Sequence, residues 1–201
     1  MKEIIPLFPA KVVVFPDQEL SLQIADKRYQ KLIEDCWQNN ATFGIQPLID
    51  DKVQNTGTQV EIIKLDKKQS HHRIEITIKG KRVYRLLNHR DSIKHELYSN
   101  GIVAFIPPQP ERDQGVKDKL ISCLQQFEQL LFNSHKLYRE LSSANTIYDI
   151  VTRVGLSLKK QYSLLANPSE SGRRRILLNH CRQQYAIEKQ VMAISDKLVD
   201  N

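Results

Sequence analysis

Residues 4–45 read IIPLFPAKVVVFPDQELSLQIADKRYQKLIEDCWQNNATFGI, and this stretch decides the fold. It begins with two short apolar runs, Ile4–Leu7 and Val12–Phe15, which end at the aromatic–proline pairs Phe8-Pro9 and Phe15-Pro16. Proline lacks an N–H and does not fit inside a central strand, so each pair is predicted to punctuate a β-segment. A third run alternates apolar and polar residues and predicts another strand, through Leu20, Leu22 and Ile24.

A helix is predicted directly after these strands. Asp26 is suited to be its N-cap, because an aspartate side chain accepts hydrogen bonds from the free N–H groups of a first helical turn. Asn39-Asn40 ends the pattern, and Phe43-Gly44-Ile45 is typical of the start of a further strand. The apolar residues recur at helical spacing and form one face, which consists of Tyr29, Leu32, Ile33, Cys36 and Trp37.

The order of these motifs carries a family resemblance. Leu-Phe-Pro, five residues, Phe-Pro, an alternating strand, an Arg-Tyr helix and Phe-Gly-Ile together resemble the N-terminal domain of the Lon family of ATP-dependent proteases. Thr56-Gly57-Thr58 and Ile78–Arg85 are similar to later motifs of that domain, and Ile150–Ser157 is similar to the helices behind it. The resemblance covers essentially the whole chain. It implies a β-rich, PUA-like domain that contacts protein substrates.

The middle of the chain keeps the period of two that strands require. A polar hairpin tip is expected over 66–70, and a tight turn is expected at Gly80-Lys81. Four more strands are predicted, over 60–63, 74–78, 83–87 and 101–106.

Helical spacing replaces this alternation after Pro107–Pro110. Gly155 is a good residue to follow a helix, Ser157 can cap the next one, and a long final helix is expected to begin near Ser169. Together with the resemblance, this predicts an α+β chain. Residues 1–110 would form a PUA-like β-rich pseudo-barrel domain with one packed helix, and residues 111–201 an all-α four-helix bundle domain.

Three arginines, Arg173–Arg175, stand at the start of the final helix, where the helix macrodipole disfavours cations. We expect one or two of them to reach a carboxylate such as Glu170 or Asp149, or the last carbonyls of the preceding helix. The resemblance favours a structural bridge between helices. An anion site or a partner site is the alternative.

The composition is typical of a globular chain, with 201 residues, 40% apolar and 26% charged. No apolar run reaches the roughly 20 residues that span a bilayer, and the first residues lack the apolar core of a signal peptide.

Cys36, Cys123 and Cys181 are widely spaced and form no CxxC pair, so we expect buried free thiols in a reducing compartment. A cytoplasmic location is therefore expected.

Sequence motifs for catalysis are absent. There is no GxxxxGK[ST] phosphate loop, no GxSxG elbow and no local Cys–His signature, and the two resembling parts leave no room for a Ser–Lys peptidase domain. His71-His72 is the most plausible metal candidate, but adjacent strand residues point to opposite faces and do not chelate one ion readily. We expect no catalytic residue, no cofactor and no metal, and therefore not an enzyme.

Basic residues are concentrated over 64–94, where ten Lys or Arg stand against three Asp or Glu. This segment alone accounts for the net charge of +7. The period of two places Arg82 and Tyr84 on one strand face, with Lys81, Val83 and Arg85 on the other. Three interpretations stay open: a solvated surface, contact with an acidic or protein partner, or nucleic-acid binding in which an aromatic ring stacks on a base. The candidate partner-binding residues are Lys79, Lys81, Arg82, Tyr84 and Arg85.

The resemblance implies that the chain recognises unfolded or extended polypeptides, or a protein partner, without catalysis. An exposed sheet edge that takes an extended peptide is one possible mechanism, and an apolar groove is another. The alternative function is a PUA-like module that binds RNA through the basic 64–94 region, an analogy at the level of the fold alone. No membrane partner is expected.

Overall fold

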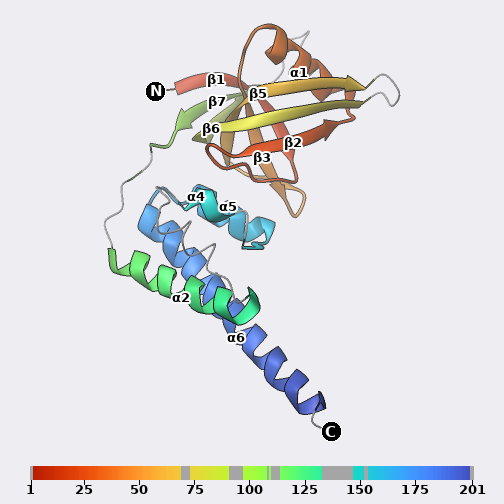
Figure 1. Ribbon diagram of the computed structural model, residues 1–201. Coiled ribbons are helices and arrows are strands. Elements are labelled where there is room, and N and C mark those ends of the chain that lie inside the picture. Colours follow the sequence, from red (N-terminus) through yellow and green to blue (C-terminus); the bar gives the residue numbers. More distant parts are fainter. Residues whose placement is uncertain are drawn as a thin grey trace. The chain divides into compact units, whose positions relative to one another are not determined.

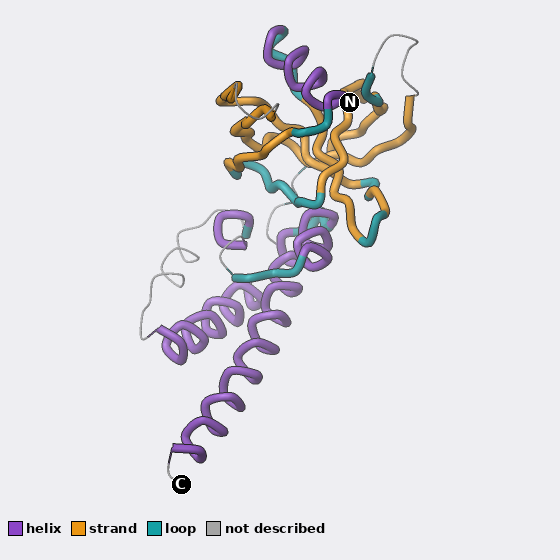
Figure 2. The backbone as a smooth tube through the Cα atoms, turned by 90° about the vertical axis from the view of Figure 1, so that its right-hand side faces the viewer, coloured by secondary structure: helices purple, strands orange, loops and turns teal. Residues whose placement is uncertain are grey.

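The computed structural model describes residues 2–68, 73–90, 97–107, 109, 114–132, 147–151 and 154–199. The chain divides into two compact units, Met1–Pro107 and Pro108–Asn201. Figure 1 shows a sheet with helix α1 in the first unit and further helices in the second, and Figure 2 shows the same elements coloured by type. The prediction of a mixed chain, with strands before C-terminal helices, is confirmed.

The strands of the first unit form one sheet that closes on itself. Its order is β1-β7-β6-β5-β3-β4, β2 pairs with β6, and an additional pairing joins β1 to β3. The ring of pairings runs from β1 through β7, β6, β5 and β3 back to β1. The elements are β1 Lys2–Ala10, β2 Glu19–Ile24, α1 Lys27–Gln38, β3 Phe43–Ile49, β4 Lys52–Val53, β5 Thr56–Lys68, β6 Arg73–Arg90 and β7 Asn100–Phe105.

Strand β1 closes the ring because it changes partner along its length. Lys2–Pro6 pairs antiparallel with β7, and Leu7–Ala10 pairs parallel with β3. The prediction that Phe8-Pro9 ends the strand is therefore wrong, since β1 continues through the pair to Ala10. The predicted segment Val12–Phe15 is also not a strand. It is irregular chain, buried from Val13 to Phe15 and anchored where the Thr58 hydroxyl donates to the Val14 carbonyl at 2.5 Å.

Strand β6 contains a second departure from the sequence prediction. Gly80-Lys81 is no turn, because β6 runs unbroken from Arg73 to Arg90. The pairing with β5 shifts register here, with Gln59 opposite Arg82 and Val60 opposite Gly80. Lys81 is the extra residue of a β-bulge, which kinks a strand without ending it.

Helix α1 packs its predicted face on the sheet. The Asp26 side chain accepts a hydrogen bond from the Arg28 N–H at 2.9 Å, as expected of an N-cap. Leu32, Ile33 and Cys36 are buried, but Trp37 is 43% exposed and lies at the margin of that face. The core beneath the helix includes Phe8, Phe43, Ile45, Val60, Ile74, Ile76 and Ile78.

The second unit is helical in its described part. Helix α2 packs on α6, and α5 also packs on α6. Ser157 caps α5 by accepting from the Lys160 N–H at 3.4 Å, and Gly155 has a φ of +62°, both as expected. Among the described helices, none has the length and apolar content needed to cross a bilayer. The helices are α2 Gln114–Phe132, α4 Tyr148–Val151, α5 Leu158–Ala166 and α6 Glu170–Val199.

Candidate binding surfaces

The basic candidates lie together on β6 but differ in their partners. Lys81 pairs with Glu61 on β5 at 3.2 Å. Arg82 pairs with Glu3 on β1 at 3.2 Å, and its guanidinium lies 3.6 Å from the centre of the Phe105 ring on β7. Such exposed ion pairs contribute little stability. Arg82 Nε also donates to the buried Gln59 side chain on β5 at 3.0 Å, so Arg82 contacts three neighbouring strands.

Lys79 and Arg85 are the two basic candidates that remain available for a partner. Arg85 is exposed and Lys79 is partly exposed. Neither has an ion pair within the described ranges. A partner with acidic groups would thus meet two unpaired cations along β6, with the paired Lys81 and Arg82 between them.

The predicted alternation of faces holds from Arg82 onward, beyond the bulge. Residues 82–85 lie opposite residues 59–56 without a register shift, so Arg82 and Tyr84 share one face, and Val83 and Arg85 share the other. Burial differs along the shared face, because Arg82 is exposed whereas Tyr84 is buried. Lys81, the extra residue of the bulge, falls outside this alternation.

Tyr84 is a core residue, so its interpretation as a stacking platform at the surface is wrong. Its side chain has no exposed area, and its hydroxyl donates to the Ile45 carbonyl at 3.3 Å. Burial raises the pKa of this hydroxyl far above its ordinary value. A ring in this position does not stack on a base or a ligand.

Two glycines make room for the Tyr84 ring. A Cβ at Gly44 would lie 2.5 Å from the Tyr84 hydroxyl oxygen, and one at Gly57 would lie 2.6 Å from it. Such distances are far shorter than a real contact, so only glycine fits at both places. Phe43-Gly44-Ile45, Thr56-Gly57-Thr58 and Tyr84 thus meet at one packing site in the core.

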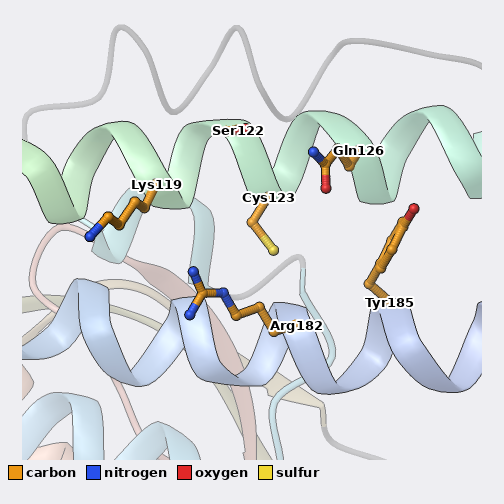
Figure 3. A pocket seen from close by; sticks show the side chains of 6 residues that line it. All are labelled: Lys119, Ser122, Cys123, Gln126, Arg182 and Tyr185. Atoms are coloured by element: carbon orange, nitrogen blue, oxygen red, sulfur yellow. The ribbon is translucent and has the colours of Figure 1, made fainter.

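A pocket of about 250 Å³ lies between α2 and α6 in the second unit (Figure 3). Burial raises the pKa of the Cys123 thiol, while the charge of Arg182 opposes that shift. No histidine or carboxylate is among the lining residues, and the lining groups that could transfer a proton are the side chains of Lys119 and Tyr185. The lining consists of Lys119, Ser122, Cys123, Gln126, Arg182 and Tyr185.

The arginines at the start of α6 form the predicted structural bridge. Arg173 donates from Nε and Nη2 to Glu170 Oε2 at 3.0 and 2.8 Å, and from Nη1 to the Asn167 carbonyl at 2.7 Å. Arg174 Nε donates to Glu170 Oε1 at 3.3 Å. The same carboxylate accepts from the Ile147 N–H at 2.8 Å. The bridge to Glu170 and to the end of α5 is confirmed, and it joins three segments of the second unit.

The histidine and cysteine predictions have mixed outcomes. His71-His72 lies outside the described residues. Within the described ranges, no group of three His, Cys, Asp or Glu side chains is placed to hold a metal ion. Burial raises the pKa of both the Cys36 and the Cys181 thiols to about 12, as expected of inert thiols, whereas Cys123 is only partly buried.

Both the sequence and the fold of this chain are similar to those of known proteins. The model of the ATP-dependent protease La (LON) substrate-binding domain matches residues 4–179. No curated protein matches the chain. Two solved structures are similar in fold. The Lon N-terminal domain protein from Xanthomonas campestris has a TM-score of 0.65 and 22% identity, over 88% of this chain and 98% of that one. The N-terminal domain of Mycobacterium avium complex Lon protease has a TM-score of 0.73 and 13% identity, over 90% and 98%.

These matches agree with the motif order read from the sequence. The two structures are less than 25% identical in sequence to this chain, so their similarity shows the fold alone. The family model spans both compact units and includes the Phe-Pro, Phe-Gly-Ile and Thr-Gly-Thr motifs. The chain belongs to the family of Lon substrate-binding domains.

Proposed function

We propose that this chain is a non-catalytic module that recognises polypeptide segments in the cytoplasm. One observation carries the proposal, namely the match of residues 4–179 to a substrate-binding domain. The Cys123 thiol in the pocket between α2 and α6 supports the non-catalytic part, because burial raises its pKa and so disfavours the reactive thiolate. Recognition would therefore depend on surfaces rather than on a reactive side chain.

The finer architecture belongs to the same proposal. The closed ring of strands supports a PUA-like pseudo-barrel, with α1 as its packed helix. The packing of α2 and α5 on α6 supports a helical bundle, which we propose has four helices. We further propose that these parts are two domains, residues 1–110 and 111–201.

Within the first domain, we place a partner contact on the exposed basic residues of β6. Lys79 and Arg85 are open to an acidic group, and the ion pairs of Lys81 with Glu61 and of Arg82 with Glu3 are partly exposed, so a ligand could displace these glutamates. Tyr84 is left out because it is buried. Without an exposed aromatic ring among these residues, the nucleic-acid alternative depends on charge alone.

A binding experiment with the whole chain tests the proposal. The probes are a permanently unfolded, reduced and alkylated protein and a single-stranded RNA, each measured over a range of salt concentrations. We expect the unfolded protein to bind with weak salt dependence and to be recovered uncleaved. Binding of RNA alone, with affinity that falls steeply as salt rises, would replace this proposal with the nucleic-acid alternative.

A charge-reversal variant locates the contact. Lys81→Glu, Arg82→Glu and Arg85→Glu together are expected to abolish any RNA binding and to weaken polypeptide binding only modestly. The matched control reverses three exposed lysines elsewhere, Lys27, Lys52 and Lys189. If the control variant loses as much affinity as the β6 variant, net charge governs binding and the β6 contact is wrong.

A further inference from the structure

Strand β2 has one partner strand and one free edge. It pairs antiparallel with β6 from Glu19↔Lys79 to Ile24↔Ile74. In the part of the chain that the structure describes, no strand pairs with its other side. Figure 1 shows β2 beside β6. A free edge presents backbone N–H and C=O groups that have no partner strand.

The register shows which peptide groups of β2 point outward. The Gly80 N–H donates to the Gln18 carbonyl at 2.9 Å, which makes this pair a hydrogen-bonded one. In an antiparallel ladder such pairs alternate with pairs whose peptide groups point away from the partner. Counting along the register from Gln18, the outward residues are Glu19, Ser21 and Gln23.

Side-chain geometry supports this assignment. Side chains approach more closely in the pairs that lack hydrogen bonds, and the Ser21 and Thr77 hydroxyl oxygens lie 3.4 Å apart across such a pair. None of the backbone bonds outside the sheet ladders involves Glu19, Ser21 or Gln23 in the described ranges. Three N–H groups and three carbonyls therefore line the edge at regular spacing.

The edge of β2 has few of the features that usually prevent pairing with another chain. Natural edge strands are very short, bulged, or carry proline or charged side chains, lysine above all. Strand β4 follows that rule, since it has two residues and one is Lys52. Strand β2 has six residues, reads ELSLQI, and pairs without a register shift. It contains no proline and no lysine, and its one charged residue is Glu19 at its first position.

The side chains of β2 define what an added strand would meet. Leu20 and Leu22 are partly buried and pack against the main core. Glu19, Ser21 and Gln23 are exposed on the opposite face. A strand beside β2 would place every second side chain next to the leucines, where an apolar group would complete their burial. The other side chains would face water.

We propose that the free edge of β2 binds an extended polypeptide segment as an added strand, with apolar side chains at alternate positions. The inference rests on the proposed function and deepens it, because it assigns the substrate class and the site. Main-chain hydrogen bonds to Glu19, Ser21 and Gln23 supply affinity without reading sequence, and Leu20 and Leu22 select apolar residues. Such segments are exposed in unfolded proteins and hidden in folded ones.

The test uses the whole chain and a short fluorescein-labelled peptide that alternates valine and threonine. Ser21→Pro removes one outward N–H and puts a ring on the edge, and we expect affinity to fall at least about tenfold. The matched control, Ser21→Ala, keeps the N–H and should bind like the wild-type chain. Melting curves establish whether each variant is folded.

Methylated peptides keep the test valid even if the proline variant does not fold. An added strand bonds to β2 through alternate amides only. Methylation of one alternate set of peptide nitrogens should therefore abolish binding, and methylation of the other set should not. Equal binding of both methylated peptides to the wild-type chain overturns the inference.

These binding experiments distinguish failure of the proposed function from failure of the β2 site. If the wild-type chain binds neither the peptide nor the unfolded protein, the proposed function fails and the inference fails with it. If it binds the unfolded protein but Ser21→Pro binds equally well, the function stands and the β2 edge is wrong. If Ser21→Pro instead converts a dimer into a monomer, a second copy of β2 occupies the edge, and the inference is overturned.

Discussion

Arg82 and Arg173 both come from basic stretches of the sequence and both pair with a glutamate, but they lie in opposite environments. The side chains of Arg82 and Glu3 are 49% and 30% exposed. Those of Arg173 and Glu170 are 5% and 6% exposed. The number of basic residues in a stretch of sequence therefore does not distinguish a solvent-exposed ion pair from a buried one. Arg173 differs from Arg82 in lying at the N-terminus of α6, where the macrodipole disfavours a cation and the facing Glu170 carboxylate offsets that cost.

The largest effect is expected from removal of the buried anion. Glu170→Ala leaves Arg173 and Arg174 buried without their carboxylate and frees the Ile147 N–H, so we expect a loss of about 3–5 kcal/mol in the free energy of unfolding. Urea denaturation followed by circular dichroism measures it. Glu3→Ala is the exposed control, with an expected loss of at most about 1 kcal/mol. Equal losses in the two variants would contradict the comparison.

A lysine in place of each arginine tests geometry at constant charge. Arg173→Lys keeps the cation but cannot donate to Glu170 twice and to the Asn167 carbonyl at once, so we expect a loss of about 2 kcal/mol. Arg82→Lys should cost less, because in the described part of the chain Arg82 has only one hydrogen bond to a buried side chain, that of Gln59 at 3.0 Å, and its ion pair with Glu3 is partly exposed. Thermal melting of both variants gives the measurement. A larger loss for Arg82→Lys would show that its contact with Phe105 matters more than burial does.

Within the basic stretch of β6, the neutral residue Tyr84 is expected to contribute more to the free energy of unfolding than its charged neighbour Arg85. Tyr84→Phe removes the hydrogen bond to the Ile45 carbonyl but keeps the ring between Gly44 and Gly57, and we expect a loss of about 1 kcal/mol. Denaturant midpoints of Tyr84→Phe and Arg85→Gln provide the comparison. A larger loss for Arg85→Gln would place the stabilising contacts of this stretch at its surface.

The smallest effect concerns salt. Raising ionic strength to about 1 M shortens the screening length to about 3 Å and should remove any contribution of the Glu3–Arg82 pair. The stability difference between the wild-type chain and Glu3→Gln, below about 1 kcal/mol in dilute buffer, should then vanish. The difference for Glu170→Gln should persist, because water and ions do not reach that pair. Denaturation at two salt concentrations decides between these outcomes.

Sequence reasoning succeeded where one local signal had one structural answer. Asp26 and Ser157 cap helices as predicted, and the helical spacing of Leu32, Ile33 and Cys36 placed them in the core. The misplaced charge at Arg173 predicted its partner. Each of these caps, faces and ion pairs forms between residues that are close in the sequence or lie on one helix. The sequence around each position is therefore enough to predict it.

The failures came from interactions between distant segments. The bulge at Lys81 depends on how β6 meets β5, and the burial of Tyr84 depends on the space left by Gly44 and Gly57. The Phe8-Pro9 pair lies inside a strand because β1 exchanges one partner for another beside it. Nothing within these short motifs specifies the partner. The free edge of β2 likewise becomes visible only from the sheet order.

The two partners of β1 have a consequence for the synthesis of the chain. Its first half pairs with β7, so that Lys2 lies opposite Ala104, and its second half pairs with β3. A growing chain therefore carries β1 with half of its peptide groups unpaired until about residue 105 has left the ribosome. Loop closure over such a separation is slow compared with local folding. The first unit is thus expected to complete its sheet only after β7 has been synthesised, and a chaperone that shields an N-terminal strand would raise its yield.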